Sequence, residues 1–178
     1  METAWYFRLF FVYLGWFVFN LLLLAIIQPK RMSGPGGSKP IQMVSYIGII
    51  AGWVLTWFIP YSITMSFWIG LGIIILGLII SSLSFAAMRE YPERKQAVVD
   101  WGIYRVSRHS HVLSSMFCLL GTVVIGWNRH SVIYLILWVY FVLYVTLSHF
   151  WVLSEEKLNV ERFGQEYLDY MKRVPRYL

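Results

Sequence analysis

The segment Val99–Val112 reads VDWGIYRVSRHSHV and carries dense charge in a chain that is otherwise mostly apolar. A second charged segment, Glu155–Arg176, reads EEKLNVERFGQEYLDYMKRVPR and follows after two further apolar runs. If those two runs form one helical hairpin through a membrane, both charged segments lie on the same side. We therefore predict that the two segments meet and close over a single site.

Composition places the chain among membrane proteins. It has 178 residues, of which 58% are apolar, 19% aromatic and only 13% charged, and we predict a single domain over residues 1–178. The formal net charge of +6 could indicate nucleic-acid binding. However, the basic residues stand in short segments beside apolar runs, which is the pattern of the positive-inside rule, so no nucleic-acid partner is predicted.

Five apolar runs approach the ~20 residues that a helix needs to cross a bilayer core of ~30 Å. Their continuity lacks the alternation of barrel strands, so we predict an all-α integral membrane protein with five transmembrane helices. The first three spans occupy residues 1–88, and the motif-bearing region occupies residues 89–178. The runs are Trp5–Ile27, Met43–Pro60, Ile63–Met88, Val112–Trp127 and Ser131–Leu153.

Five spans place the two ends of the chain on opposite sides of the membrane. With the C-terminus in the cytoplasm, every Lys and Arg except Arg8 and Arg129 lies on the cytoplasmic side. The positive-inside rule therefore predicts a multi-pass protein with its N-terminus outside, its C-terminus inside and lipids as its surroundings.

The second charged segment is predicted to continue the last span in helical register. Apolar and aromatic residues recur at three- and four-residue spacing, which gives the helix an amphipathic face. We expect this face to fold back onto the loop at Arg89–His111, and we expect Ser131 to cap the last span. The face consists of Phe163, Tyr167, Tyr170, Met171 and Val174.

The two charged segments together resemble the isoprenylcysteine carboxyl methyltransferase and phospholipid N-methyltransferase group of integral membrane methyltransferases. That pattern reads G-x-Y-x-x-x-R-H-P, one helical hairpin, then E-E, F-G, two spaced tyrosines and a basic residue before V-P. The likeness covers the C-terminal part of the chain, while the first three spans match only in hydropathy. The chain departs from the pattern at Ser110, where the family usually has proline, and at Val112, where it usually has an aromatic residue.

The resemblance implies S-adenosylmethionine as methyl donor, bound on the cytoplasmic side between the two segments. It also implies a lipophilic or membrane-dissolved acceptor, such as a prenylcysteine-type carboxylate, an amine headgroup or a small thiol. By position, Glu155 and Arg173 are the implied catalytic residues, with Arg173 serving the acceptor. The implied cofactor-binding residues are Gly102, Tyr104, Arg108, His109 and Glu156.

Elementary chemistry supports these roles unequally. Neighbouring helix residues point about 100° apart, so one of Glu155 and Glu156 is expected to contact the donor and the other to support it. Arg108 and His109 stand at a helix entrance, where an anionic group is favoured. Each of these candidates also has a simpler interpretation. The two glutamates can be an ordinary solvated helix end, Arg108 a charge that sets the membrane topology, and His109 a polar capping residue.

The last candidate arginines are open to two interpretations. Arg173 suits a carboxylate acceptor, but Asp169 lies four residues before it and offers an ordinary helix ion pair. Arg176 is a second candidate for the acceptor.

Two other functions stay open. Membrane sterol reductases share a related Tyr and Arg-His helix entrance, and Ser110 with Val112 would also suit a non-catalytic protein that retains the fold. No metal site is predicted, because the sequence has no CxxC or HExxH motif and His109 with His111 is a poor ligand set.

Overall fold

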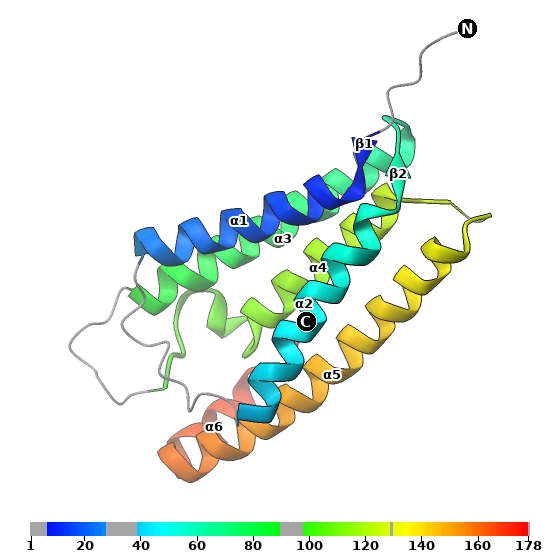
Figure 1. Ribbon diagram of the computed structural model, residues 1–178. Coiled ribbons are helices and arrows are strands. Elements are labelled where there is room, and N and C mark those ends of the chain that lie inside the picture. Colours follow the sequence, from blue (N-terminus) through cyan, green and yellow to red (C-terminus); the bar gives the residue numbers. More distant parts are fainter. Residues whose placement is uncertain (1–6, 28–38, 90–97, 129, 178) are drawn as a thin grey trace, which may run out of the picture.

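The computed structural model describes residues 7–27, 39–89, 98–128 and 130–177, and it is built almost entirely from helices (Figure 1). The long helices run roughly along one direction, and the short elements lie at the two ends of the bundle. In chain order the elements are β1 (Phe7–Arg8), α1 (Leu9–Ile27), α2 (Lys39–Trp57), β2 (Pro60–Tyr61), α3 (Met65–Arg89), the 3₁₀ helix η1 (Gly102–Arg105), α4 (Ser110–Ile125), α5 (Val132–Phe163) and α6 (Gln165–Arg173).

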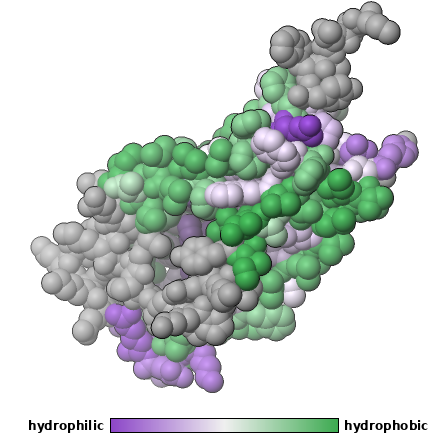
Figure 2. All heavy atoms as spheres, in the orientation of Figure 1, coloured by the Kyte–Doolittle hydropathy of each residue, from purple (hydrophilic) through white to green (hydrophobic). Residues whose placement is uncertain are grey.

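Three helices are long and apolar enough to cross a membrane: α1 over Leu9–Ile26, α3 over Met65–Met88, and α5. The apolar stretches Ile47–Trp57 in α2 and Ser110–Ile125 in α4 are shorter. The prediction of an all-α membrane protein is confirmed at this level, while the count of five spans and the side on which each end lies stay predictions. Figure 2 shows apolar side chains along the flanks of the bundle and polar side chains at its ends.

Helix α5 is longer than a membrane is thick. Its 32 residues extend for about 48 Å at ~1.5 Å per residue, against a hydrocarbon core of ~30 Å. Its apolar part is followed by Glu155 and Glu156, so this end of the helix projects beyond the bilayer core. The helix thereby holds the second charged segment at the same end of the bundle as η1 and the start of α4 (Figure 1).

Helices α3 and α4 pack closely because small residues face each other. A Cβ atom added to Gly70 would lie 2.5 Å from the carbonyl oxygen of Gly121, and one added to Gly121 would lie 2.5 Å from that of Gly70. One added to Gly77 would lie 2.7 Å from Sγ of Cys118. In lipid, such close backbone contact is a main source of helix association. Helix α4, which begins at the last residue of the Arg108-His109-Ser110 (RHS) motif, is therefore packed closely against α3.

We expect Gly121→Ala to lower the free energy of unfolding in detergent by about 1–3 kcal/mol, since the added methyl group overpacks the α3–α4 contact. Gly72→Ala is the matched control, because a Cβ atom there meets nothing within 4 Å. That control should be neutral or slightly more stable, as alanine favours helix. Thermal unfolding followed by tryptophan fluorescence measures both, and equal midpoints would contradict the packing argument.

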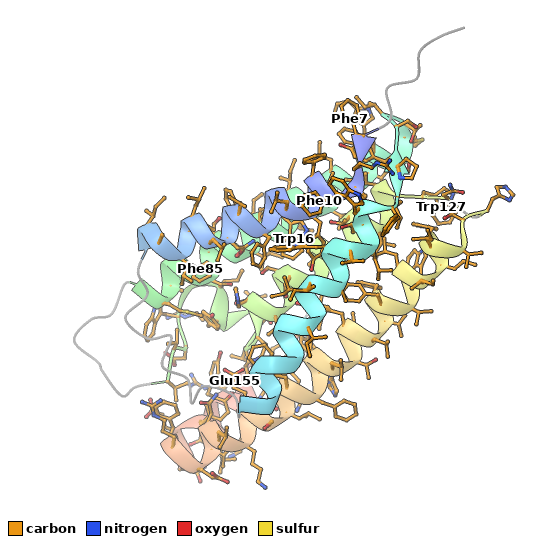
Figure 3. All side chains as sticks on the ribbon, viewed as in Figure 1. Phe7, Phe10, Trp16, Phe85, Trp127 and Glu155 are labelled. Carbon is orange, nitrogen blue, oxygen red and sulfur yellow. The ribbon has the colours of Figure 1, made fainter. Side chains whose placement is uncertain are left out.

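The opposite end of the bundle is closed by apolar and aromatic side chains. Strands β1 and β2 pair antiparallel, with Phe7 opposite Tyr61. Figure 3 places Phe7 and Trp127 at this end and Glu155 near the other. The predicted cap is confirmed, since Oγ of Ser131 accepts a hydrogen bond from the Tyr134 amide at 3.3 Å. The buried apolar cluster next to this end of the bundle comprises Leu9, Ile59, Ile74, Val123, Ile125, Tyr134 and Leu137.

The C-terminal region differs in one respect from its prediction. The second charged segment does not continue as one helix, because α5 ends at Phe163 and Gly164 adopts a φ of 57°, from which α6 starts in a new direction. A residue with a side chain rarely adopts this φ, so the glycine permits the break between α5 and α6. The predicted amphipathic face is confirmed: Tyr167, Tyr170 and Val174 are buried together with Val98, and Phe163 and Met171 pack against them.

Candidate functional site

The loop before α4 is fastened to the end of α3. Nε1 of Trp101 donates a hydrogen bond to the Ala87 carbonyl oxygen at 2.8 Å. Gly102 has a φ of 57°, and a Cβ atom there would lie 3.2 Å from the Cβ of Ala87. Both the backbone angle and this approach favour glycine. Gly102 therefore sets the backbone direction of η1. This short helix positions Tyr104 and, just after its end, Arg108.

Tyr104 is part of a buried group of hydroxyls. Burial raises the pKa of its hydroxyl, while hydrogen bonds with Ser110 and Ser84 act to lower it. The effect of burial is larger, so the hydroxyl is neutral at pH 7. Oγ of Ser84 on α3 donates to Oγ of Ser110 at 2.8 Å. The backbone oxygen of Tyr104 accepts from the Tyr170 hydroxyl at 2.8 Å, which joins η1 to α6. Tyr104 thus links both charged segments.

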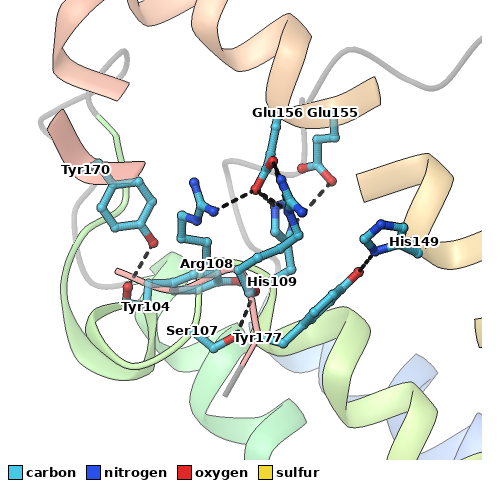
Figure 4. Close-up of polar contacts among 10 residues, drawn as sticks. Tyr104, Ser107, Arg108, His109, His149, Glu155, Glu156, Tyr170 and Tyr177 are labelled. Atoms are coloured by element: carbon cyan, nitrogen blue, oxygen red, sulfur yellow. Dashed lines mark hydrogen bonds and ion pairs between the residues drawn. The ribbon is translucent and has the colours of Figure 1, made fainter. Parts of the chain in front are cut away.

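Glu156 is the centre of the polar cluster (Figure 4). Its side chain is only 5% exposed, yet it has three nitrogen-bearing partners. Nη2 of Arg108 lies 3.2 Å from Oε1, and Nε2 of His109 lies 3.3 Å from the same oxygen. Arg176 donates from Nε to both oxygens at 3.1 and 3.0 Å and from Nη2 to Oε2 at 2.7 Å. A buried carboxylate between two guanidinium groups stays ionised, and its hydrogen bonds raise the pKa of Arg176.

His109 is neutral at physiological pH. Burial lowers its pKa to about 4, against the attraction of Glu156, and the charges of Arg108 and Arg176 act in the same direction as burial. A neutral imidazole has one N–H, and the contact at 3.3 Å assigns it to Nε2, which donates to Glu156. Nδ1 then carries a lone pair and lies 3.7 Å from Oε2 of Glu155, too far for a hydrogen bond.

Arg108 has open donors. Its side chain is 7% exposed, and one nitrogen, Nη2, reaches Glu156. Its Nε and Nη1 are buried and have no hydrogen-bond partner within the described part of the chain. A buried guanidinium donor left without an acceptor is costly, so these N–H groups favour an added acceptor of negative charge.

Glu155 differs from its neighbour. Its side chain is 38% exposed, and its Oε2 lies 3.7 Å from Nδ1 of the neutral His109 ring. The two neighbouring carboxylates therefore lie in different environments: Glu156 is buried inside the cluster, and Glu155 is partly exposed beside it. That one of them contacts a methyl donor stays a prediction.

The comparison with known families follows this geometry. Residues 1–174 match the family model described as a protein of unknown function, DUF1295. The chain belongs to the DUF1295 family. This family is associated with membrane proteins like the steroid 5α-reductases and the phospholipid methyltransferases. No curated protein and no solved structure matches this DUF1295 chain.

The structure brings most, but not all, of the predicted site residues of this DUF1295 protein together. Arg173 lies outside the cluster, with a side chain 65% exposed and Nη2 3.4 Å from Oδ2 of Asp100. Its predicted partner Asp169 pairs instead with Lys172, at 2.9 Å. The arginine that enters the cluster is Arg176, the second candidate.

Sequence reasoning missed the backbone contacts of the last described residues. The Pro175 and Arg176 carbonyl oxygens accept hydrogen bonds from the Arg108 and His109 amides at 3.1 and 3.3 Å. Oγ of Ser107 also donates to the Arg176 oxygen at 3.2 Å. Main-chain pairing between an extended segment and a loop leaves no pattern in side-chain types, so the sequence contains no signal for it.

Proposed function

We propose that this protein is an integral membrane methyltransferase that uses S-adenosylmethionine to methylate a lipophilic acceptor. The observation that carries the proposal is the pair of open groups in one cluster: the buried N–H donors of Arg108 and the carboxylate of Glu155. The donor molecule presents a carboxylate at one end and positive charge at its ammonium and sulfonium groups. Arg108 fits the carboxylate, and Glu155 fits the sulfonium charge.

The residues hold and orient the reactants under this proposal. The cofactor, when bound, supplies an electrophilic methyl group, and the chain contributes position and exclusion of water. Gly102 and Tyr104 would position η1 beside the ligand, His109 would contribute a neutral ring, and Glu156 would fix Arg108. Arg173, at the rim on α6, is proposed to serve the acceptor.

The acceptor is proposed to reach the site from the bilayer. Helices α1, α3 and α5 expose apolar side chains along their length, and the cluster lies at one end of them (Figures 2 and 3). A prenylcysteine-type carboxylate, an amine headgroup and a small thiol fit this route equally. We further propose that this end faces the cytoplasm, on the charge pattern of the sequence.

A membrane reductase of the sterol reductase type is the second candidate, and the family's association supports it. The open donors of Arg108 suit a phosphate group as well as a carboxylate. Binding of adenosylmethionine and of NADPH to the purified protein, each competed with the other, separates the two functions. Binding of neither would favour a non-catalytic protein.

The role of Glu155 gives the sharper test. Glu155→Gln is expected to weaken adenosylmethionine binding about 10-fold, which is ~1.4 kcal/mol, since the carboxylate attracts the sulfonium charge. Adenosylhomocysteine lacks that charge, so its affinity should change little. Isothermal titration of both ligands measures the difference.

Glu161→Gln is the matched control, because it removes a carboxylate from the same helix at an exposed position. Equal losses for the two ligands in Glu155→Gln would remove Glu155 from the sulfonium site. No binding of either ligand to the unaltered protein would overturn the methyltransferase proposal itself.

A further inference from the structure

Arg176 reaches Glu156 from a segment that is separate from every other member of the cluster. Helix α6 ends at Arg173, and Val174 is extended, with φ −121° and ψ 129°. The segment Val174–Tyr177 then pairs with the loop before α4 through the carbonyl oxygens of Pro175 and Arg176. At its far end the Tyr177 hydroxyl lies 3.3 Å from Nδ1 of His149 on α5 (Figure 4). Arg176 is thereby held in place on both sides.

The position of Arg176 limits what Arg108 can do. Nε and Nη2 of an arginine form the fork that matches a carboxylate, and Arg176 places this fork on both oxygens of Glu156. His109 and Arg108 share the Oε1 atom of Glu156. Arg108 therefore contacts this carboxylate through Nη2 alone. A carboxylate accepts about four hydrogen bonds, so Glu156 has no room for a second fork.

We propose that Arg176 is a positioning residue: by occupying the fork position on Glu156, it keeps Arg108 from closing onto the same carboxylate and so holds Nε and Nη1 of Arg108 open for the ligand. The identity of that ligand rests on the proposed function. The arrangement of the two arginines does not.

Removal of Arg176 would free the fork position on Glu156 for Arg108. A buried guanidinium with open donors is less stable than one paired in a fork, so Arg108 would rotate to place Nε and Nη2 on Glu156. Glu156 would still be paired, and the fold would be kept. The donors that serve the ligand would then be engaged inside the protein.

Arginine side-chain NMR tests this step without any ligand. In protein labelled with ¹⁵N-arginine, the Nε–H signal of Arg108, assigned with Arg108→Lys, is expected near the position of an unbonded group. In Arg176→Gln it should move downfield, because a hydrogen bond to a carboxylate deshields the proton. Arg176→Lys should also move it, since a lysine keeps the charge but has no fork.

Lys172→Gln is the matched control, as it removes an exposed positive charge from the same region and should leave the Arg108 signal in place. An Arg108 signal that is unchanged in Arg176→Gln, or that is already downfield in the unaltered protein, would overturn the proposal. So would an equal movement in Lys172→Gln.

A second measurement adds the ligand. Adenosylhomocysteine should bind Arg176→Gln at least about 10-fold more weakly than the unaltered protein, a loss comparable to that of Arg108→Met alone. An unchanged affinity in Arg176→Gln would count against action through Arg108. If the unaltered protein does not bind adenosylhomocysteine, the methyltransferase proposal fails, and the NMR result alone decides the positioning role.

Discussion

Glu156→Gln is expected to cost the protein about 3–5 kcal/mol in its free energy of unfolding, the largest stability loss of any change in the cluster. The carboxylate is buried and forms ion pairs with both Arg108 and Arg176. An amide of the same shape removes the negative charge and turns one acceptor into a donor. Two guanidinium groups then face each other with nothing to neutralise them. Thermal or denaturant unfolding in detergent, followed by tryptophan fluorescence, measures the loss.

Glu155→Gln provides the matched comparison for that measurement. It makes the same chemical change one residue earlier, at a side chain that is 38% exposed, so the expected loss is below about 1 kcal/mol. Adding Arg108→Met to Glu156→Gln should recover part of the stability, because one of the two uncompensated charges is removed. Equal effects of the two glutamate changes would show that Glu156 is not the centre of the cluster. Under the proposed function, Glu156→Gln should also weaken binding of adenosylmethionine, since Arg108 loses its anchor.

The helices could be predicted because long apolar runs have few alternatives in a membrane. The ends of the helices could not be predicted equally well. The apolar run Ser131–Leu153 predicts where α5 is lipophilic, but the helix itself continues to Phe163, where hydropathy no longer marks it. Its end depends on the left-handed backbone of Gly164, and a glycine in a sequence does not state which backbone angle it adopts.

The site could be predicted as a meeting of two segments but not as a set of contacts. The 100° spacing of Glu155 and Glu156 predicted different roles, one contacting the methyl donor and the other supporting it, and the two side chains do lie in different environments. Which of them is the support depends on where Arg176 lies, and that follows from the break at Gly164 and the extended Val174. Arg173 and Arg176 look alike in the sequence, and only the folded chain separates them.

Ser110 shows how a departure from a pattern can be compensated. The proline usual at this position in the membrane methyltransferases that the segment resembles would fix the first turn of α4 through its ring. Here Ser110 is fully buried, and its Oγ accepts a hydrogen bond from Ser84 on α3. The partner comes from a different helix, so no local reading of the RHS motif could reveal it. The first turn is thus fixed by a tertiary contact in place of a rigid ring, which weakens the case for a protein that lost its chemistry at this position.

Arg108→Met is expected to abolish most ligand binding while leaving the fold as stable as before, or more stable. Methionine fills a similar volume and removes a buried guanidinium whose Nε and Nη1 have no partner in the described chain. Glu156 keeps the Arg176 fork, with contacts as short as 2.7 Å, so its charge stays neutralised. Each lost hydrogen bond between a charged donor and the ligand carboxylate is worth about 1.5–3 kcal/mol, so the loss of even one should weaken adenosylhomocysteine binding roughly 10- to 150-fold.

Lost binding together with retained stability would identify Arg108 as a ligand-binding residue. Removal of a residue present only for structure should lower the unfolding midpoint, as we expect for Glu156, whereas removal of a residue held ready for a ligand should relieve a local destabilisation. Arg105→Met is the matched control, because Arg105 is exposed on η1 and its loss should alter neither quantity. Titration calorimetry and thermal unfolding on the same samples measure both. If Arg108→Met destabilises the protein as strongly as Glu156→Gln, its guanidinium belongs to the scaffold, and the open donors are not a binding site.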